Sequence, residues 1–278
     1  MGQQYRGRQG CRVSEGEPLE RIGVFDSGIG GLTVLRRLRS AFPRLDMVYL
    51  GDLARVPYGG RSVDTIARYA VDDVEFLLRR GVEAVVAACG TVSSNALEVL
   101  QRRYDLPVYG VIDSAARRAA ALTKTGSVGV IGTQATIKSG AFRRHVAAAD
   151  PAVSVTEQAC PLIVPLVENG VEPGDPLAEL VCRRYLSAFE GKNVDALIMG
   201  CTHYPLFRPA FEALLPGVEM IDVGQALAED LRGVFGGLQG AGRTEYFVTE
   251  RSAAFDELVR NIDPGVDPAD IRIADIDE

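Results

Sequence analysis

The 278-residue sequence lacks several features that would point to other classes of protein. It has no apolar run approaching the ~20 residues that a membrane-spanning helix requires. Residues 1–20 lack the apolar centre of a signal peptide, so we expect a cytoplasmic protein with a disordered tail over these residues. With a net charge of -7, it also lacks the basic excess typical of proteins that bind nucleic acids or anionic membranes. We therefore expect neither nucleic acid nor membrane among its partners.

Cysteine and histidine are too few and too poorly spaced for a metal site or a disulfide framework. There are five cysteines, an odd number, and no two of them have C-x-x-C spacing. The only histidines are His145 and His203, and Cys201 with His203 supplies at most two ligands close together. Disulfides are also rare in cytoplasmic proteins. We expect no metal and no disulfide.

The sequence also lacks a complete dinucleotide-binding glycine motif. The run Gly28-Ile29-Gly30-Gly31 departs from G-x-G-x-x-G because Thr33 stands where the last glycine belongs. No flavin, nicotinamide or pyridoxal motif is present, so we expect no cofactor. The triplet Asp26-Ser27-Gly28 resembles that of aspartic proteases, but a helical pattern follows it and no second triplet exists. We interpret the turn as a backbone N–H cradle for a carboxylate, supported by Ser and Thr hydroxyls.

The chain does contain an alternation of short apolar strands and amphipathic helices. Strands are expected at residues 21–25, 47–50, 84–88, 107–112, 128–131, 153–156, 196–199 and 218–221. Short apolar runs that end in turn residues are typical of buried parallel strands, and their alternation with helices indicates an α/β fold.

The pattern restarts in the second half of the chain. The strand at Ile22 and the residue Cys89 have counterparts about 110 residues later, at Val128 and Cys201. Any alternating α/β protein has some periodicity, but here both cysteines follow a strand and precede a threonine within two residues. We expect two similar domains with mainly parallel sheets flanked by helices, related by a pseudo-twofold axis, with the active site in the cleft between them.

In such an arrangement, Cys89 and Cys201 lie on opposite walls of one cleft, at the strand ends where α/β proteins bind ligands. A thiolate on one wall can take a proton from a carbon atom, and a thiol on the other can deliver a proton to the opposite face, which inverts the stereocentre. We expect a helix N-terminus to lower the pKa of both thiols. His203 could hold or share the proton of Cys201, and Asp26 that of Cys89.

Several segments carry a resemblance to a known family. They read GVFDSGIGGLTVL at 23–35, GD at 51–52 with ARVPYG at 54–59, ATIKSG at 135–140, ACPL at 159–162 with VPLVE at 164–168, and GCTHYPL at 200–206. With them the sequence resembles the glutamate racemases, which are cofactor-independent members of the aspartate/glutamate racemase group. The resemblance implies interconversion of L- and D-glutamate, which supplies D-glutamate for peptidoglycan. It further implies a homodimer, with a first α/β domain over 21–114 plus 222–278 and a second over 115–221.

The resemblance also implies a set of site residues. Cys89 is the acid/base residue that acts on D-glutamate, and Cys201 the one that acts on L-glutamate. The assisting residues are Asp26, Glu168 and His203. The substrate-contacting positions are Asp26, Ser27, Pro57, Tyr58, Gly59, Gly90, Thr91, Thr136 and Thr202.

One departure from the family pattern falls next to the first thiol. The family usually has asparagine where this chain has Gly90, so we expect weaker glutamate binding than with asparagine there. Two alternative interpretations remain: a racemase of the same fold that acts on another amino acid or a hydantoin, and a non-catalytic regulator. Retention of both thiols, together with the assisting residues, speaks against the regulator.

Overall fold

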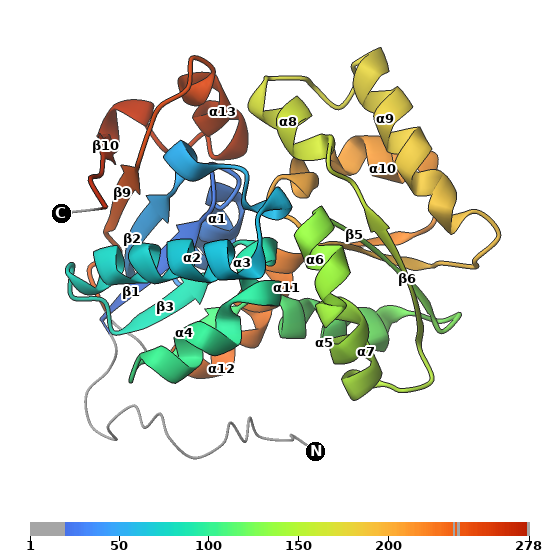
Figure 1. Ribbon diagram of the computed structural model, residues 1–278, viewed down its shortest axis with the longest axis horizontal. Coiled ribbons are helices and arrows are strands. Elements are labelled where there is room, and N and C mark those ends of the chain that lie inside the picture. The colour runs from blue at the N-terminus through green and yellow to red at the C-terminus, as the bar shows by residue number, and fades with distance from the viewer. Residues whose placement is uncertain (1–19, 236, 238–239, 277–278) are drawn as a thin grey trace.

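The computed structural model describes residues 20–235, 237 and 240–276. The tail that we expect over residues 1–20 therefore lies, except for Glu20, outside the described residues. Two sheets stand side by side, with helices around them (Figure 1).

The larger sheet has six parallel strands in the order β10-β9-β2-β1-β3-β4. Their bounds are β1 Arg21–Asp26, β2 Asp46–Gly51, β3 Ala84–Ala87, β4 Val108–Gly110, β9 Thr244–Val248 and β10 Ile271–Ile273. The last two strands come from the C-terminal segment and extend the sheet beyond β2.

The smaller sheet has four parallel strands in the order β6-β5-β7-β8. They are β5 Ser127–Gly132, β6 Ser154–Ala159, β7 Ala196–Met199 and β8 Glu219–Asp222. Their order repeats that of β2-β1-β3-β4 in the larger sheet, so that β3 corresponds to β7. The expected fold of two parallel sheets flanked by helices is confirmed, and the repeated strand order supports the duplication inferred from the sequence.

Helices connect the strands of both sheets. They are α1 Leu32–Ala41, α2 Val63–Leu78, α3 Gly90–Asn95, α4 Leu97–Arg103, α5 Ile112–Leu122, α6 Gln134–Ser139, α7 Ala141–Ala149, α8 Ile163–Glu168, α9 Pro176–Leu186, α10 Arg208–Leu214, α11 Val223–Asp230, α12 Arg232–Phe235 and α13 Phe255–Ile262. In the part of the chain that the structure describes, no helix is long and apolar enough to cross a membrane.

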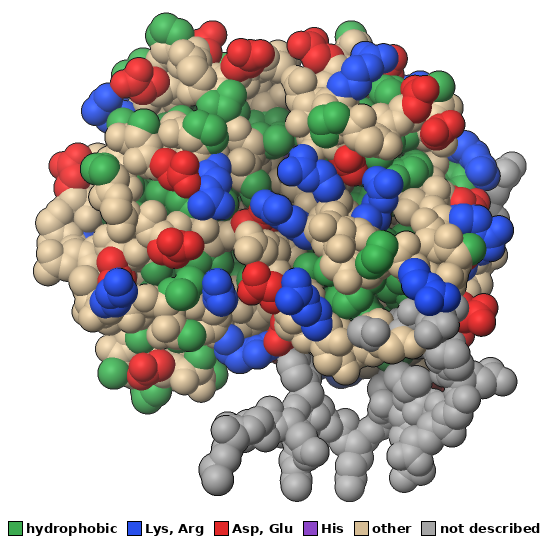
Figure 2. Space-filling model, turned by 180° about the vertical axis from the view of Figure 1, so that it is seen from behind, with side chains coloured by type: hydrophobic (Ala, Val, Ile, Leu, Met, Phe, Trp, Pro, Cys, Tyr) green, Lys and Arg blue, Asp and Glu red, His purple; other side chains and the backbone are tan. Residues whose placement is uncertain are grey.

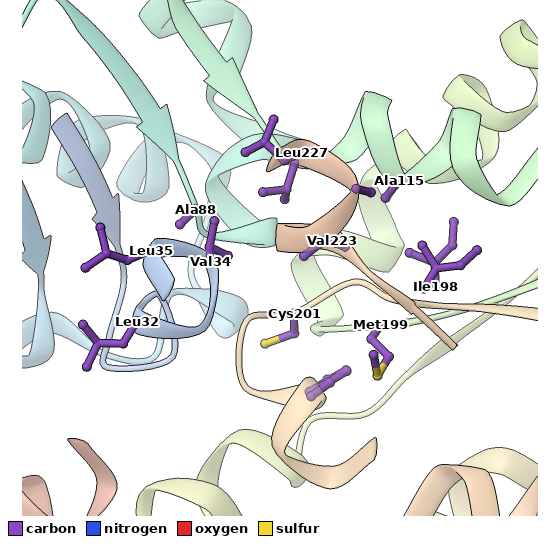
Figure 3. Close-up of a cluster of buried hydrophobic side chains, with 14 of the residues drawn as sticks. Leu32, Val34, Leu35, Ala88, Ala115, Ile198, Met199, Cys201, Val223 and Leu227 are labelled. Atoms are coloured by element: carbon purple, nitrogen blue, oxygen red, sulfur yellow. The ribbon is translucent and has the colours of Figure 1, made fainter. Parts of the chain in front are cut away.

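An apolar core joins the two halves of the molecule. Helix α1 contacts α11, α11 contacts α5, and α5 contacts β7. Figure 3 shows side chains of these elements in one cluster, among them Val34, Ala115, Ile198 and Leu227, each at most 2% exposed. Burial of such a side chain stabilises a fold by roughly 1.5–3 kcal/mol when it is large. This shared core fixes the elements from both sheets relative to one another, and with them the loops that follow the strands.

Two expected boundaries differ from the structure. The strand expected over 107–112 ends at Gly110, and α5 begins at Ile112. Asp113 therefore lies in the first turn of a helix, where a carboxylate is favoured by the helix dipole, and it pairs with His145 and Arg117. The helix expected from residue 93 begins earlier, directly after Cys89, and is interrupted at Ala96.

Charged side chains of both signs are interspersed over the face of the molecule seen in Figure 2. Ion pairs of the described residues include Arg37 with Asp222 and Arg39 with Asp263. The surface in this view is mixed in charge and does not form a single basic area.

Candidate active site

A small cavity of about 20 Å³ contains both of the cysteines singled out from the sequence. It is lined by Ser27, Val56, Pro57, Tyr58, Gly59, Cys89, Gly90, Thr91, Thr133, Val164, Cys201, Thr202 and His203. Cys89 follows β3 and Cys201 follows β7, which are corresponding strands of the two sheets. The carboxyl ends of both parallel sheets thus contribute to one site, as expected for α/β proteins.

A larger cavity, of about 350 Å³, lies elsewhere in the molecule. It is lined by Arg36, Arg39, Ser40, Phe42, Pro43, Leu45, Gly242, Thr244 and Asp263. Its arginines are already engaged, because Arg36 donates to the carbonyl of Ile262 and Arg39 pairs with Asp263. No thiol or imidazole lines it. The chemistry that the sequence predicts therefore belongs to the smaller cavity.

Cys89 is a buried thiol held by a hydroxyl. Its Sγ lies 3.3 Å from Oγ of Ser27, and its side chain is only 4% exposed. Burial, reinforced by the charge of Asp26, raises the pKa of Cys89 to about 12, although Ser27 and the Val92 N–H oppose this shift. The expected lowering by the field of α3 is wrong for this arrangement, because desolvation of the thiolate outweighs a short helix. In this geometry Cys89 carries its proton.

Cys201 belongs to a chain of proton-handling groups. Its Sγ lies 3.8 Å from Nδ1 of His203, and Nε2 of His203 lies 2.7 Å from Oε1 of Glu168. Burial lowers the pKa of His203, but the hydrogen bonds and charges of Cys201 and Glu168 outweigh it and leave that pKa well above 6.5. The imidazole of His203 is thus held between the side chains of Glu168 and Cys201 in the form that carries a positive charge.

No α-helix begins directly after Cys201, contrary to the expectation for this thiol. A turn follows it, then a 3-10 segment over Tyr204–Phe207 and only then α10. The group next to this thiol is the imidazole of His203 and not a helix N-terminus. Figure 3 shows the sulfur of Cys201 pointing away from Met199, toward the side of the view where α1 lies.

The glycine-rich turn after β1 does form an N–H cradle, but a carboxylate of the protein itself occupies it. Oδ2 of Asp26 accepts hydrogen bonds from the N–H groups of Gly28 and Gly31, at 3.1 and 3.0 Å. Thr202 donates to the same carboxylate from the loop after β7. The interpretation of the turn as a cradle for a foreign carboxylate is therefore corrected. Asp26 acts on Cys89 through its charge, while the hydrogen-bond partner of Cys89 is Ser27.

Burial also raises the pKa of the Asp26 carboxyl, to about 6, against the opposing effects of His203, the two glycine N–H groups and Thr202. Because this pKa exceeds its ordinary value of 3.8, the folded state binds more protons than the unfolded state between the two values. The contribution of Asp26 to the free energy of unfolding should then fall by roughly 3 kcal/mol as the pH rises from about 4 to about 7. Asp26→Asn removes this titration.

Urea unfolding of both proteins across this pH range checks the prediction. The difference in unfolding free energy, wild type minus Asp26→Asn, should decrease up to about pH 7 and then stay constant. A difference that does not vary with pH would show that Asp26 titrates normally in the folded protein.

Tyr58 lines the cavity, but its hydroxyl points into a separate buried network. It donates to Asp52 and, at 3.0 Å, to Asp73, and Arg55 forms ion pairs with both carboxylates at 2.5 and 2.9 Å. This network fixes the Pro57–Gly59 wall from behind. The wall also packs closely on the other half of the molecule, because a Cβ at Gly59 would lie 2.6 Å from Cβ of Thr133.

A chain of hydroxyls connects the two halves beside the cavity. Oγ1 of Thr91 lies 2.9 Å from Oγ1 of Thr133, which lies 3.0 Å from that of Thr136. Thr136 is buried behind Thr133 and does not itself line the cavity, and neither does Asp26 or Glu168. Thr133 was missed by sequence reasoning, although it directly follows β5, the counterpart of the strand that ends at Asp26. Val56 and Val164 were also missed, because apolar side chains give no chemical signal.

The lining brings two thiols from different sheets to one cavity. Cys89 holds its proton, and Cys201 is linked through His203 to Glu168. Over the described ranges, no three His, Cys, Asp or Glu side chains converge as metal ligands. The arrangement is suited to general acid–base chemistry by paired thiols.

Comparison with known proteins gives consistent matches over most of the chain. The family model of the Asp/Glu/Hydantoin racemases matches residues 22–231. The glutamate racemase of Aquifex aeolicus (strain VF5) is 47% identical over 242 residues, covering 87% of this chain and 93% of that relative.

Solved structures match as well. Glutamate racemase from Thermus thermophilus in complex with beta-chloro-D-alanine has a TM-score of 0.81 and 44% identity, covering 94% of this chain and 99% of that one. Glutamate racemase from Francisella tularensis subsp. tularensis SCHU S4 in complex with D-glutamate has a TM-score of 0.85 and 33% identity, covering 93% and 98%.

Proposed function

Because the chain belongs to the Asp/Glu/Hydantoin racemase family and its relatives are glutamate racemases, we propose that its two-thiol cavity interconverts L- and D-glutamate. It is an isomerase of the amino-acid racemase class. The observation that carries the mechanism is that Cys89 and Cys201, from corresponding strands of two sheets, line one cavity.

In the proposed reaction, the Cys201 thiolate removes the Cα proton of L-glutamate. The Cα–H bond breaks, an S–H bond forms, and the electron pair remains on the substrate. The Cys89 thiol then gives its proton to the opposite face of Cα, leaving a thiolate on Cys89. This direction requires a protonated Cys89, which its raised pKa provides, and a positive charge beside Cys201, which the imidazolium of His203 provides. For D-glutamate the two thiols exchange roles.

Other side chains have supporting roles in this proposal. His203 and Glu168 stabilise the thiolate of Cys201 through the 2.7 Å hydrogen bond between them. Asp26 positions Thr202 and adjusts the proton affinity of Cys89 through its charge. Contacts to the substrate are assigned to the lining residues Ser27, Pro57, Tyr58, Gly59, Gly90, Thr91 and Thr202, with Thr136 acting through Thr133.

The wider biological setting is also proposed from the family. The enzyme supplies D-glutamate for peptidoglycan in the cytoplasm and acts as a homodimer. We further propose that residues 21–114 with 222–278, and residues 115–221, are its two domains. The placement of β9 and β10 beside β2, in the same sheet as β1, supports this division.

An assay of amino-acid enantiomers tests the substrate. Glutamate should be racemised with a kcat/KM about 10- to 200-fold above that of aspartate, because one methylene is worth that much in discrimination. The rate is followed by circular dichroism, with the Cys89→Ala variant as blank. Equal or better turnover of aspartate, another amino acid or a hydantoin would reassign the substrate while leaving the reaction class in place.

A further inference from the structure

The two thiol-bearing loops touch each other through their main chains. Gly90 follows Cys89, and Gly200 precedes Cys201. A Cβ built at Gly90 would lie 2.2 Å from the carbonyl oxygen of Gly200, 3.2 Å from its carbonyl carbon and 3.8 Å from Cα of Cys201. Non-bonded heavy atoms normally stay about 3.5–4.0 Å apart. Only a residue without a side chain at position 90 permits this contact, because both obstructing groups are backbone.

The contact leaves too little room for a substrate between the walls. The cavity of about 20 Å³ can hold about one water molecule. Sites for small ligands usually have roughly 300 Å³ or more. Both thiols are also nearly shut off from solvent, at 4% exposure for Cys89 and 6% for Cys201. Glutamate can enter only after the loops separate.

Two hydrogen bonds between the halves that carry the two thiols hold the same arrangement. Thr91 hydrogen-bonds Thr133 at 2.9 Å, and Thr33 donates to the carbonyl of Thr202 at 3.0 Å. These bonds are favourable only when the walls approach closely, which a side chain at position 90 would prevent. The absent side chain therefore determines whether this set of contacts can form.

We infer that Gly90 allows a collapsed arrangement that excludes substrate and so determines the apparent affinity for glutamate. When the binding-competent arrangement is only a fraction of the population, the apparent dissociation constant is raised by the inverse of that fraction. A side chain at position 90 removes the collapsed arrangement and this penalty with it. The inference rests on the proposed function only in naming glutamate; the collapse itself concerns the protein alone.

Thiol modification without substrate tests the collapse. Iodoacetamide labelling of each cysteine is followed by mass spectrometry in the wild type, in Gly90→Ala and in the matched control Gly60→Ala. A Cβ at Gly60 meets nothing within 4 Å, so this control adds a methyl group near the cavity without obstruction. Labelling of Cys89 and Cys201 should accelerate about tenfold or more in Gly90→Ala only. Cys182, buried in α9, reports general loosening and should stay unchanged.

Steady-state kinetics of Gly90→Asn test the consequence for binding. KM should fall by the same factor for L- and D-glutamate, because the collapsed arrangement excludes both. Gly90→Asn is labelled in the same way. Unchanged labelling of Cys89 and Cys201, or equal acceleration at Cys182 in both Gly90→Ala and Gly90→Asn, would overturn the collapse. An unchanged or raised KM in Gly90→Asn would overturn the link to affinity. Faster labelling in a protein without racemase activity would support the collapse and refute the proposed function.

Discussion

Replacement of either Cys89 or Cys201 by alanine should abolish racemisation of both glutamate enantiomers, with kcat falling by about 10²–10⁴-fold or more. Each direction of the reaction needs one thiolate as base and the other thiol as acid, and both side chains line the cavity. Polarimetry or circular dichroism measures the loss. Cys182→Ala, a change of a buried thiol in α9 away from this lining, is the control and should retain activity.

Solvent deuterium distinguishes the two thiols from one another. In heavy water the wild type should place deuterium at Cα of the product enantiomer. Cys89→Ala retains the base that faces L-glutamate, so any residual Cα exchange should be confined to that enantiomer; Cys201→Ala should show the reverse. Substantial racemisation by either single variant would refute the two-thiol mechanism.

The second large effect is expected at His203. His203→Asn removes the charged partner 3.8 Å from Cys201 and leaves Glu168 without its 2.7 Å hydrogen bond. Loss of such electrostatic stabilisation costs about 10²–10³-fold in kcat. Because the equilibrium constant of a racemisation is one, kcat/KM must fall equally in both directions. A role of His203 on the Cys201 side only therefore cannot be detected from kcat/KM and needs another measurement.

Isotope effects supply that readout. With His203→Asn, proton removal by Cys201 becomes the slower step, so the primary isotope effect should rise for L-glutamate deuterated at Cα and fall for the D-enantiomer. Glu168→Gln should change both in the same direction but less. His145→Asn alters the other histidine, which pairs with Asp113 outside the cavity lining, and should change nothing. Equal isotope effects in wild type and His203→Asn would contradict the assignment.

The strand ends were the most predictable part of this site. Apolar runs followed by polar residues placed Cys89 and Cys201 correctly, because parallel strands bring their carboxyl ends to one edge. The hydrogen bond between His203 and Glu168 could be anticipated only through the family resemblance, since 35 residues separate the two along the chain.

What the sequence could not supply is the balance between competing electrostatic effects. A helix after Cys89 suggested a lowered pKa, but the sequence does not show how deeply the thiol is buried, and burial prevails. The sequence also did not show which carboxylate accepts hydrogen bonds from the N–H groups of the glycine turn. In the structure it is that of Asp26 itself. Gly90 was recognised as unusual, but the carbonyl opposite it belongs to a residue 110 positions away.

The pairing of β9 with β2 has a consequence for synthesis of the chain on the ribosome. β2 ends at Gly51, while its neighbour β9 begins at Thr244, so almost the whole protein is translated before that side of the strand can be covered. Until then β2 offers an unpaired row of N–H and C=O groups, which is a template for association with another chain. Because closure over so many residues is slow, the nascent protein passes through a long interval of exposure, and truncation before Thr244 would make that exposure permanent.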